Sequence, residues 1–168
     1  MVNIKRWFCH AFMPPWRWHL LFPKRVLVDI EKAVKHSEHQ HCGELRFAVE
    51  NSLALDKVWR GMSARQRALE VFSDLRVWDT EENSGVLIYL LLTDREVHIV
   101  ADRGITKRVA QTEWDAIAEV MQQEFKLGDF LRGSLHGIER ITMLLAAHFP
   151  SGADNPNELS NKPVIVEH

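Results

Sequence analysis

With 168 residues, the chain has room for one domain with a sizeable core and is too short for two domains of ordinary size. Its 46% hydrophobic and 26% charged content is close to the average of globular proteins, which argues against intrinsic disorder and a fibrous architecture. Twenty-one basic against 23 acidic residues give a net charge of −2, so no global field draws the chain to phosphates, and we expect no nucleic-acid partner.

Three features bear on the compartment. Cys9 and Cys42 are the only cysteines, too few for the disulfide framework of a small secreted domain, which favours a reducing compartment. The longest apolar run, 86–92, is far shorter than the roughly 20 residues that span a bilayer as a helix, so no transmembrane helix is expected. Residues 1–22 begin with basic residues, but prolines interrupt any apolar stretch, and we predict no signal peptide. A cytoplasmic protein, or one peripheral to the membrane, is therefore expected.

Residues 1–22 form an aromatic and basic segment. Its aromatic side chains include Trp7, Phe8, Trp16, Trp18 and Phe22. Tryptophan together with Lys and Arg is typical of the membrane interface. The same side chains would also suit the edge of the protein's own core or a partner protein. We predict a role in membrane or partner binding for these five residues, with packing on the domain as the alternative.

Periodicity then predicts alternating helices and strands. Residues 23–41 have helical spacing and begin with a proline, which suits a first helical position. Gly43 ends this helix, and 45–50 alternate in the pattern of a strand with one more buried face. A second helix is expected over 63–76, because its first residue and Gln66 have the spacing of a capping box.

A central hairpin is predicted next. The wholly polar stretch 79–84 leads into the apolar run 85–92, which is typical of a strand covered on both faces. Asp94 and Arg95 then separate it from a third strand at 96–102, which indicates a tight antiparallel turn. The expected register pairs Leu92 with Val97 and Leu87 with Asp102.

Two helices and a tail complete the chain. Thr112 with Asp115 predicts the start of a third helix, and a fourth is expected over 130–148, before Pro150. Residues 151–168 have little apolar periodicity and predict a mobile tail, in which 164–166 is the one apolar patch. The expected organisation is thus a segment 1–22, a domain 23–150 and a tail 151–168.

The order helix, strand, helix, strand, strand, helix, helix predicts the α/β class. The first two strands can be parallel through a helical crossover, while the hairpin is antiparallel. We therefore expect a three-layer α/β/α sandwich with a small mixed sheet.

Several stretches resemble the TPM family, which is named for thylakoid-lumen and photosystem II repair proteins. They are 78–105, the turn Lys126–Phe130, and the helix after it with Gly133 and Gly137. The resemblance covers roughly 24–150. Family members commonly have Gly-aromatic-Gly after the third strand, where this chain reads Asp-Arg-Gly over 102–104. Without an export signal or a terminal membrane helix, the chain is most similar to a short soluble bacterial branch.

The resemblance implies several activities without choosing among them. Family members are associated with calcium or other divalent metals, with acid-phosphatase-like activity in some plastid proteins, and with assembly or repair of membrane complexes. No P-loop, dinucleotide fingerprint, Gly-x-Ser-x-Gly elbow or His-Glu-x-x-His helix is present, so we expect no organic cofactor.

The hairpin gives an argument that is independent of the family. Antiparallel pairing places the end of the third strand beside the start of the second, which brings Asp102 and Arg103 towards 79–84. Parallel pairing brings Glu44 to the same edge. Hard oxygen ligands suited to Ca²⁺ or Mg²⁺ would then gather there. They are Asp79, Glu81, Glu82, Asn83 and Asp102. Arg103 would bind a phosphate by offsetting its charge.

Other interpretations of these residues stay open. The same edge also fits a solvated acidic loop in which Asp102 pairs with Arg103 or Arg108. Open α/β sheets usually bind ligands beyond the carboxyl ends of their parallel strands, which is the opposite edge. A cluster of potential zinc ligands follows the first helix, but adjacent residues chelate awkwardly, and histidines also favour a helix C-terminus. The cluster is His36, His39, His41 and Cys42. Trp59, Trp78 and Trp114 are expected in the core or at its edge.

Two function hypotheses follow. The first is a non-enzymatic interaction or assembly module, responsive to a divalent metal, whose segment 1–22 docks on a membrane protein or a lipid surface. The second is a metal-dependent, acid-phosphatase-like hydrolase that acts through the acidic edge.

Overall fold

A four-stranded sheet lies at the centre of the protein. The computed structural model describes residues 3–152 and 156–167. The strands are β1 (Glu44–Glu50), β2 (Gly85–Leu91), β3 (Glu96–Ala101) and β4 (Val164–Val166), in the order β3-β2-β1-β4. β1 is parallel to both β2 and β4, and β2 is antiparallel to β3. The predicted mixed sheet is confirmed.

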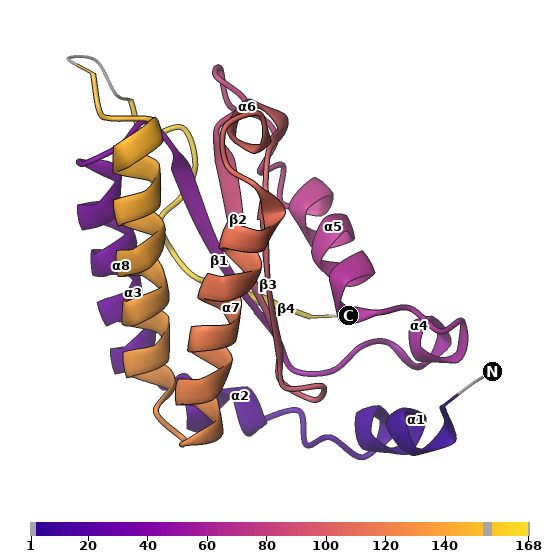
Figure 1. Ribbon diagram of the computed structural model, residues 1–168. Helices are drawn as coiled ribbons and strands as arrows, with labels where there is room; N and C mark the ends of the chain where they lie inside the picture. Colours follow the sequence, from indigo (N-terminus) through magenta and orange to yellow (C-terminus); the bar gives the residue numbers. More distant parts are fainter. Residues whose placement is uncertain (1–2, 153–155, 168) are drawn as a thin grey trace.

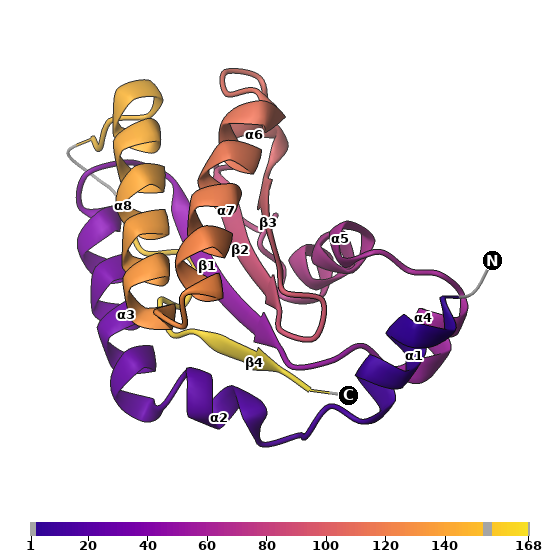
Figure 2. The ribbon, with the colours of Figure 1, turned by 60° about the horizontal axis from the view of Figure 1, so that its bottom comes forward.

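Helices cover both faces of this sheet, as Figures 1 and 2 show. One face carries α3 (Lys24–Glu38), α7 (Gln111–Lys126) and α8 (Phe130–His148), and the other carries α5 (Ala64–Asp74). The short helices are α1 (Ile4–Ala11), α2 (Arg17–Leu21), α4 (Leu55–Trp59) and α6 (Arg103–Thr106). The arrangement is the predicted three-layer α/β/α sandwich. Within the described ranges, no helix has the length and apolar character needed to cross a bilayer.

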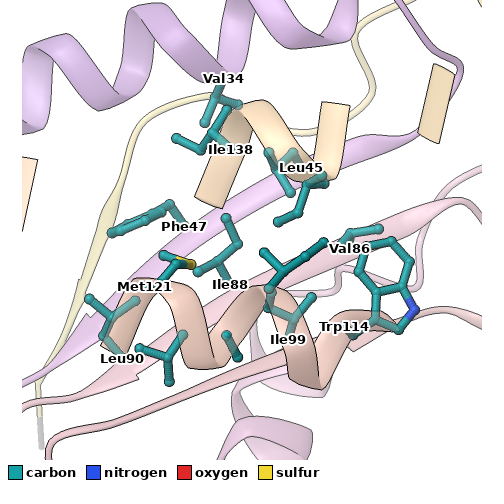
Figure 3. Packing of buried hydrophobic residues seen from close by; sticks show 14 of the residues in the cluster. Val34, Leu45, Phe47, Val86, Ile88, Leu90, Ile99, Trp114, Met121 and Ile138 are labelled. Atoms are coloured by element: carbon teal, nitrogen blue, oxygen red, sulfur yellow. The ribbon is translucent and has the colours of Figure 1, made fainter. Parts of the chain in front are cut away.

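The larger core lies between the sheet and the layer of α3, α7 and α8. Alternate side chains of β1 and β2, such as Phe47 and Ile88, meet Trp114 and Met121 of α7 and Ile138 of α8 (Figure 3). All five are at most 2% exposed, so burial of apolar surface fixes these helices on the sheet. Trp114 was predicted in the core and lies there. The other two tryptophans, also expected in the core or at its edge, lie in neither core cluster: Trp59 is 62% exposed at the end of α4, and Trp78 is 49% exposed in the turn after α5.

β1 is buried on both faces, whereas its alternation predicted a less fully covered strand. Its second face is covered by α5 and by the segment 156–166. Three ionisable side chains on that face are buried because each has a polar partner. They are Glu44, Arg46 and Glu50. A charged residue at alternate positions therefore marks an internal polar layer here, not a surface.

Two predictions about strand pairing need correction. The hairpin register is shifted by two residues, since Leu90 pairs with Val97 and Leu87 with Val100. The connection is a four-residue turn over 92–95, with Arg95 at φ 58°, so β2 ends earlier than a two-residue turn requires. A shift of two keeps each side chain on its predicted face.

The C-terminal segment is the second correction. Where the sequence predicts a mobile tail over 151–168, residues 164–166 form β4 and pair with 48–50 of β1. So short a strand pairs only because the edge of β1 is already in place. Since β1 is distant in the sequence, the pattern of residues 164–166 alone does not predict the pairing. Residues 153–155 and 168 lie outside the described residues.

Candidate functional site

The amino end of β2 and the carboxyl end of β3 lie side by side, as the hairpin argument predicted. Val86 pairs with Ala101, and the backbone N–H of Asp102 donates to the Gly85 carbonyl at 2.8 Å. Arg103 Nε donates to Asn83 Oδ1 at 2.9 Å. We call the loops 79–84 and 102–104 together the acidic edge.

Gly104 allows the two loops of the acidic edge to pack closely against each other. Its N–H donates to the Asn83 carbonyl at 3.0 Å. A Cβ at this position would lie 2.4 Å from the Glu82 carbonyl oxygen and 2.5 Å from that of Asn83. Only glycine allows the backbones to approach so closely. The one glycine that this chain keeps from the family's Gly-aromatic-Gly pattern thus closes the junction.

Asp102 has one oxygen engaged and one that is not. Its Oδ1 accepts from the Arg103 N–H at 2.6 Å and caps α6. Its Oδ2 is buried and has no hydrogen-bond partner among the described residues. The predicted side-chain pairs of Asp102 are not formed, since the guanidinium of Arg103 bonds to Asn83 and that of Arg108 bonds to the His148 carbonyl.

The other predicted metal ligands point elsewhere. Asp79, Glu81 and Glu82 are exposed, and the Glu81 N–H donates to Glu158 Oε2 at 2.8 Å. A cavity of about 600 Å³ beside them carries both signs of charge, since Lys107 also lines it. In residues 3–152 and 156–167, no group of three or more His, Cys, Asp or Glu side chains is arranged to hold a metal ion. The five ligands predicted from sequence therefore fit a cation only at Asp102, where the neighbouring Arg103 opposes it.

Glu44 comes to the same edge, as predicted, but it serves the fold. It is 1% exposed, and its Oε2 accepts from the Leu159 N–H at 2.9 Å. Burial raises the pKa of its carboxyl. Next to it, Glu38 Oε1 accepts from the Leu45 N–H at 3.0 Å, its other oxygen accepts from Asn161, and burial raises its pKa to about 7. These carboxylates tie the C-terminal segment to β1.

The predicted zinc cluster is not assembled among the described residues. His41 is buried, and its Nδ1 accepts from the Gly43 N–H at 3.1 Å, which places the proton on Nε2. Nε2 contacts Ser37 Oγ at 2.7 Å, and Ser37 bonds to Thr142 at 2.6 Å. Burial lowers the pKa of His41 to about 4. This histidine therefore joins α3 to α8, with both ring nitrogens used.

A second polar cluster was not predicted from sequence. Glu50 is fully buried. Its carboxylate accepts hydrogen bonds from Arg67 Nε at 3.0 Å and from the Tyr89 hydroxyl at 2.5 Å. Burial and the Glu50 carboxylate raise the pKa of Tyr89. Two features of the sequence could have indicated this cluster: an Arg on the inner face of α5 and a Tyr within an apolar strand. The cluster is closed to solvent and supports the sheet.

Residues 3–22 lie along the end of the sheet where the parallel strands β1, β2 and β4 finish, and we call them the N-terminal arm (Figure 1). Arg6 holds Asp94 through Nε and Nη2, the latter at 2.7 Å. The buried His10 accepts the Leu53 N–H at Nδ1, so its protonated Nε2 donates to Asp94 at 3.0 Å. Burial alone would raise the pKa of Asp94, but the hydrogen bonds from His10 and Arg6 outweigh it and lower the pKa to about 2. The arm is therefore fastened to the β2–β3 turn.

The five aromatic residues predicted to bind a membrane or partner divide into two groups. Phe22 is fully buried in the larger core, while Trp7 and Trp18 pack at core edges. Phe8 and Trp16 are 50% and 63% exposed. Packing on the domain thus accounts for three of the five, and two remain available to a partner.

Helical spacing adds residues that the sequence prediction left out. Large apolar side chains recur every four residues along the arm, so that Ile4 and Phe8 share one face of α1, while the later ones lie at the end of α1 and on α2. The five are Ile4, Phe8, Phe12, Trp16 and Leu20, each at least 50% exposed. We call this set the arm face. Phe8 and Phe12 stack with their ring centroids 5.9 Å apart.

Cations accompany the arm face. The first 28 residues contain five Lys or Arg and no Asp or Glu. Lys5, Lys24 and Arg25 are exposed and Arg17 is half-buried. Lys24 and Arg25 occupy the first turn of α3, where the helix dipole disfavours positive charge. Their placement therefore does not serve the stability of that helix.

Comparison with known proteins places this geometry in context. The model of the TPM domain family matches residues 21–144. Among solved structures, the NMR structure of the BA42 protein from the psychrophilic bacterium Bizionia argentinensis has a TM-score of 0.75 and 31% sequence identity. That similarity covers 84% of this chain and 93% of BA42. A comparison with curated proteins gives no match. The matched family region begins at residue 21, after all five residues of the arm face.

Proposed function

The chain belongs to the TPM domain family, and we propose that it is a non-enzymatic interaction module that the N-terminal arm attaches to an anionic lipid surface. The observation that carries the proposal is the arm face, five large apolar side chains held in water at a regular spacing of four residues. Exposed apolar patches of this kind mark interaction sites.

The chemistry of the arm selects lipid over a purely apolar partner. Tryptophan and phenylalanine on short amphipathic helices insert at the level of lipid headgroups, with Lys and Arg beside them. Each basic residue near an anionic leaflet contributes about 1 kcal/mol. The absence of acidic residues from the first 28 positions leaves this attraction unopposed in the sequence of the arm.

The fastening of the arm supports the same proposal. Because Arg6 and His10 hold Asp94, α1 stays on the domain while the side chains of the arm face remain exposed. A lipid surface would then meet a preformed set of side chains, without the cost of ordering a flexible segment. Cys9 and Cys42 are free thiols, which supports a reducing compartment and hence the cytoplasmic leaflet.

Sedimentation with vesicles tests this proposal. The full chain is expected to bind vesicles of phosphatidylglycerol and phosphatidylcholine, and to bind less as ionic strength rises. Phe12→Ser and Trp16→Ser should each weaken partitioning about tenfold, because each removes an inserted aromatic side chain. Met143→Ser is the matched control, since Met143 is 68% exposed on α8, away from the arm.

Equal partitioning of Phe12→Ser, Trp16→Ser and Met143→Ser would refute the proposal. A different outcome is that the two arm variants lose binding while high salt leaves wild-type binding unchanged. The arm face would then bind an apolar partner surface, and the cations would have no role.

The alternative function is the metal-dependent phosphatase, and one observation favours it. The Oδ2 atom of Asp102 is a buried carboxylate oxygen without a partner among the described residues, and such an atom is a natural ligand for Ca²⁺ or Mg²⁺. Solvent would have to complete the shell, because Arg103 already engages Asn83. An NMR titration with each cation decides: shifts confined to 79–85 and 102–105 in wild type, but absent from Asp102→Asn, would support a metal site.

A further inference from the structure

A cavity of about 230 Å³ opens at the carboxyl end of β2, between α2, the β2–β3 turn and the turn that joins α7 to α8. The apolar part of its wall comes from α2, β2 with the turn after it, α7 and α8. The main apolar contributors are Leu21, Leu90, Leu92, Phe125 and Phe130. The rings of Phe125 and Phe130 stack at 5.0 Å, which makes that side of the cavity rigid.

Three cations stand around this apolar wall. Arg95 and Lys126 are exposed and Arg17 is half-buried, so their charges lie at the rim and not inside. None of the three forms an ion pair within the described part of the chain; the interactions of Arg17 that the structure shows are with Met13. The one carboxylate of the lining, Glu96, is paired with His98 at 2.8 Å. With three cations against one carboxylate, the rim carries an excess of positive charge.

From this arrangement we infer that the cavity binds a small amphiphilic carboxylate, with a medium-length acyl chain inside and the carboxylate at the rim. The apolar interior removes the chain from water, and guanidinium groups at the mouth bind carboxylates with charge-assisted hydrogen bonds. Free inorganic phosphate would use the rim but leave the apolar wall without a partner. A neutral alcohol would use the wall but not the rim.

The position of the cavity agrees with the usual location of ligand sites in open α/β sheets. Such sites lie beyond the carboxyl ends of parallel strands, and Leu90–Leu92 stand at the carboxyl end of β2. Arg17 lies before the region that the family model matches, so the arm supplies part of the wall. The inference does not require membrane attachment, because the ligand is bound from solution.

Calorimetric titration of the full chain with sodium octanoate, below its micelle concentration and without vesicles, tests the inference. Affinity should rise about fourfold for each added methylene from butanoate to octanoate. Octanol should bind at least tenfold more weakly than octanoate. Backbone NMR shifts should be confined to 17–21, 90–96 and 122–130.

Single-residue variants distinguish a specific site from non-specific hydrophobic binding. Arg17→Gln and Lys126→Gln should each weaken octanoate binding about fivefold to tenfold, while Arg103→Gln at the acidic edge should bind as wild type does. Wild-type affinity in both rim variants, or the same affinity for butanoate and octanoate, would overturn the inference. Trp16→Ser should weaken vesicle binding about tenfold and keep octanoate binding, so failure of one proposal is distinguishable from failure of the other.

Discussion

Two regions of the molecule, the amino end of β1 and the cavity beside α2, place their charges differently. At the amino end of β1, buried carboxylates such as Glu38 and Glu44 are bonded to backbone and side chains of the C-terminal segment. At the carboxyl end, Arg17, Arg95 and Lys126 surround an apolar cavity without an ion pair among the described residues, and the arm face stays in water. Charges that hold the fold together have partners inside the chain. Arg17, Arg95 and Lys126 have no ion pair within the described residues and lie where we propose that a carboxylate ligand binds.

The largest effect is expected from removing the charge of a buried carboxyl at the amino end. Glu38 has an ordinary pKa of 4.5 when unfolded and about 7 in the fold, because it is buried. Its favourable contribution is therefore complete below pH 4.5 and is lost as pH rises through 7. Glu38→Gln has no carboxyl at this position to ionise, so its stability does not show this loss as pH rises. Relative to wild type, the variant should gain up to about 3 kcal/mol between pH 4.5 and 7.

Urea unfolding at several pH values measures this difference, with His36→Gln on the exposed side of α3 as the control. Parallel curves for Glu38→Gln and wild type would show that Glu38 is not buried as described. His41, whose pKa is lowered to about 4 by burial, loses its contribution as pH falls from 6.5, in the opposite sense, and it is present in both proteins.

Gly104→Ala should break the acidic edge at its tightest contact. The added Cβ would lie 2.4 Å from a backbone carbonyl oxygen, so the loops 79–84 and 102–104 must separate. We expect a loss of about 2 kcal/mol in the free energy of unfolding. Gly152→Ala is the matched control, because nothing lies within 4 Å of a Cβ there. Equal stability of the two variants would contradict the close approach.

Asp94→Asn should loosen the arm at the other end. The substitution removes the negative charge to which Arg6 and His10 are bonded, and hydrogen bonds to charged groups contribute about 1.5–3 kcal/mol. We expect a loss of about 1.5 kcal/mol and faster hydrogen exchange over residues 4–21. Because the pKa of Asp94 is lowered to about 2, the wild-type contribution is present above pH 3.8 and lost as pH falls towards 2. Asp56→Asn, in an exposed pair with Arg60, should change neither quantity.

Features that depend on neighbouring residues could be predicted from the sequence. The capping box at Ser63 forms with both of its hydrogen bonds, and α8 spans 130–148 as expected. The third helix begins at Gln111 without the predicted side-chain cap. The fold class and the contact between the ends of β2 and β3 follow from periodicity and chain connectivity.

Features that depend on distant residues could not be predicted. β4 exists because the edge of β1 is free, and the burial of Arg46 depends on carbonyl groups of residues 160 and 162. Whether Asp79 or Asp102 faces solvent is decided by contacts across the loop. The cavity draws its lining from five helices and strands and the turns between them, and no local pattern contains it.

The smallest expected effect gives the sharpest test of the arm. Trp16 and Trp18 are two residues apart, but Trp16 is 63% exposed while Trp18 packs on the larger core. Trp16→Ser should therefore change the free energy of unfolding by less than about 0.5 kcal/mol, whereas Trp18→Ser should cost about 1–2 kcal/mol. Vesicle binding should weaken about tenfold in Trp16→Ser, the variant that keeps its stability. Equal destabilisation by both substitutions would mean that the two indoles share one structural role, and the arm face would then be part of the core.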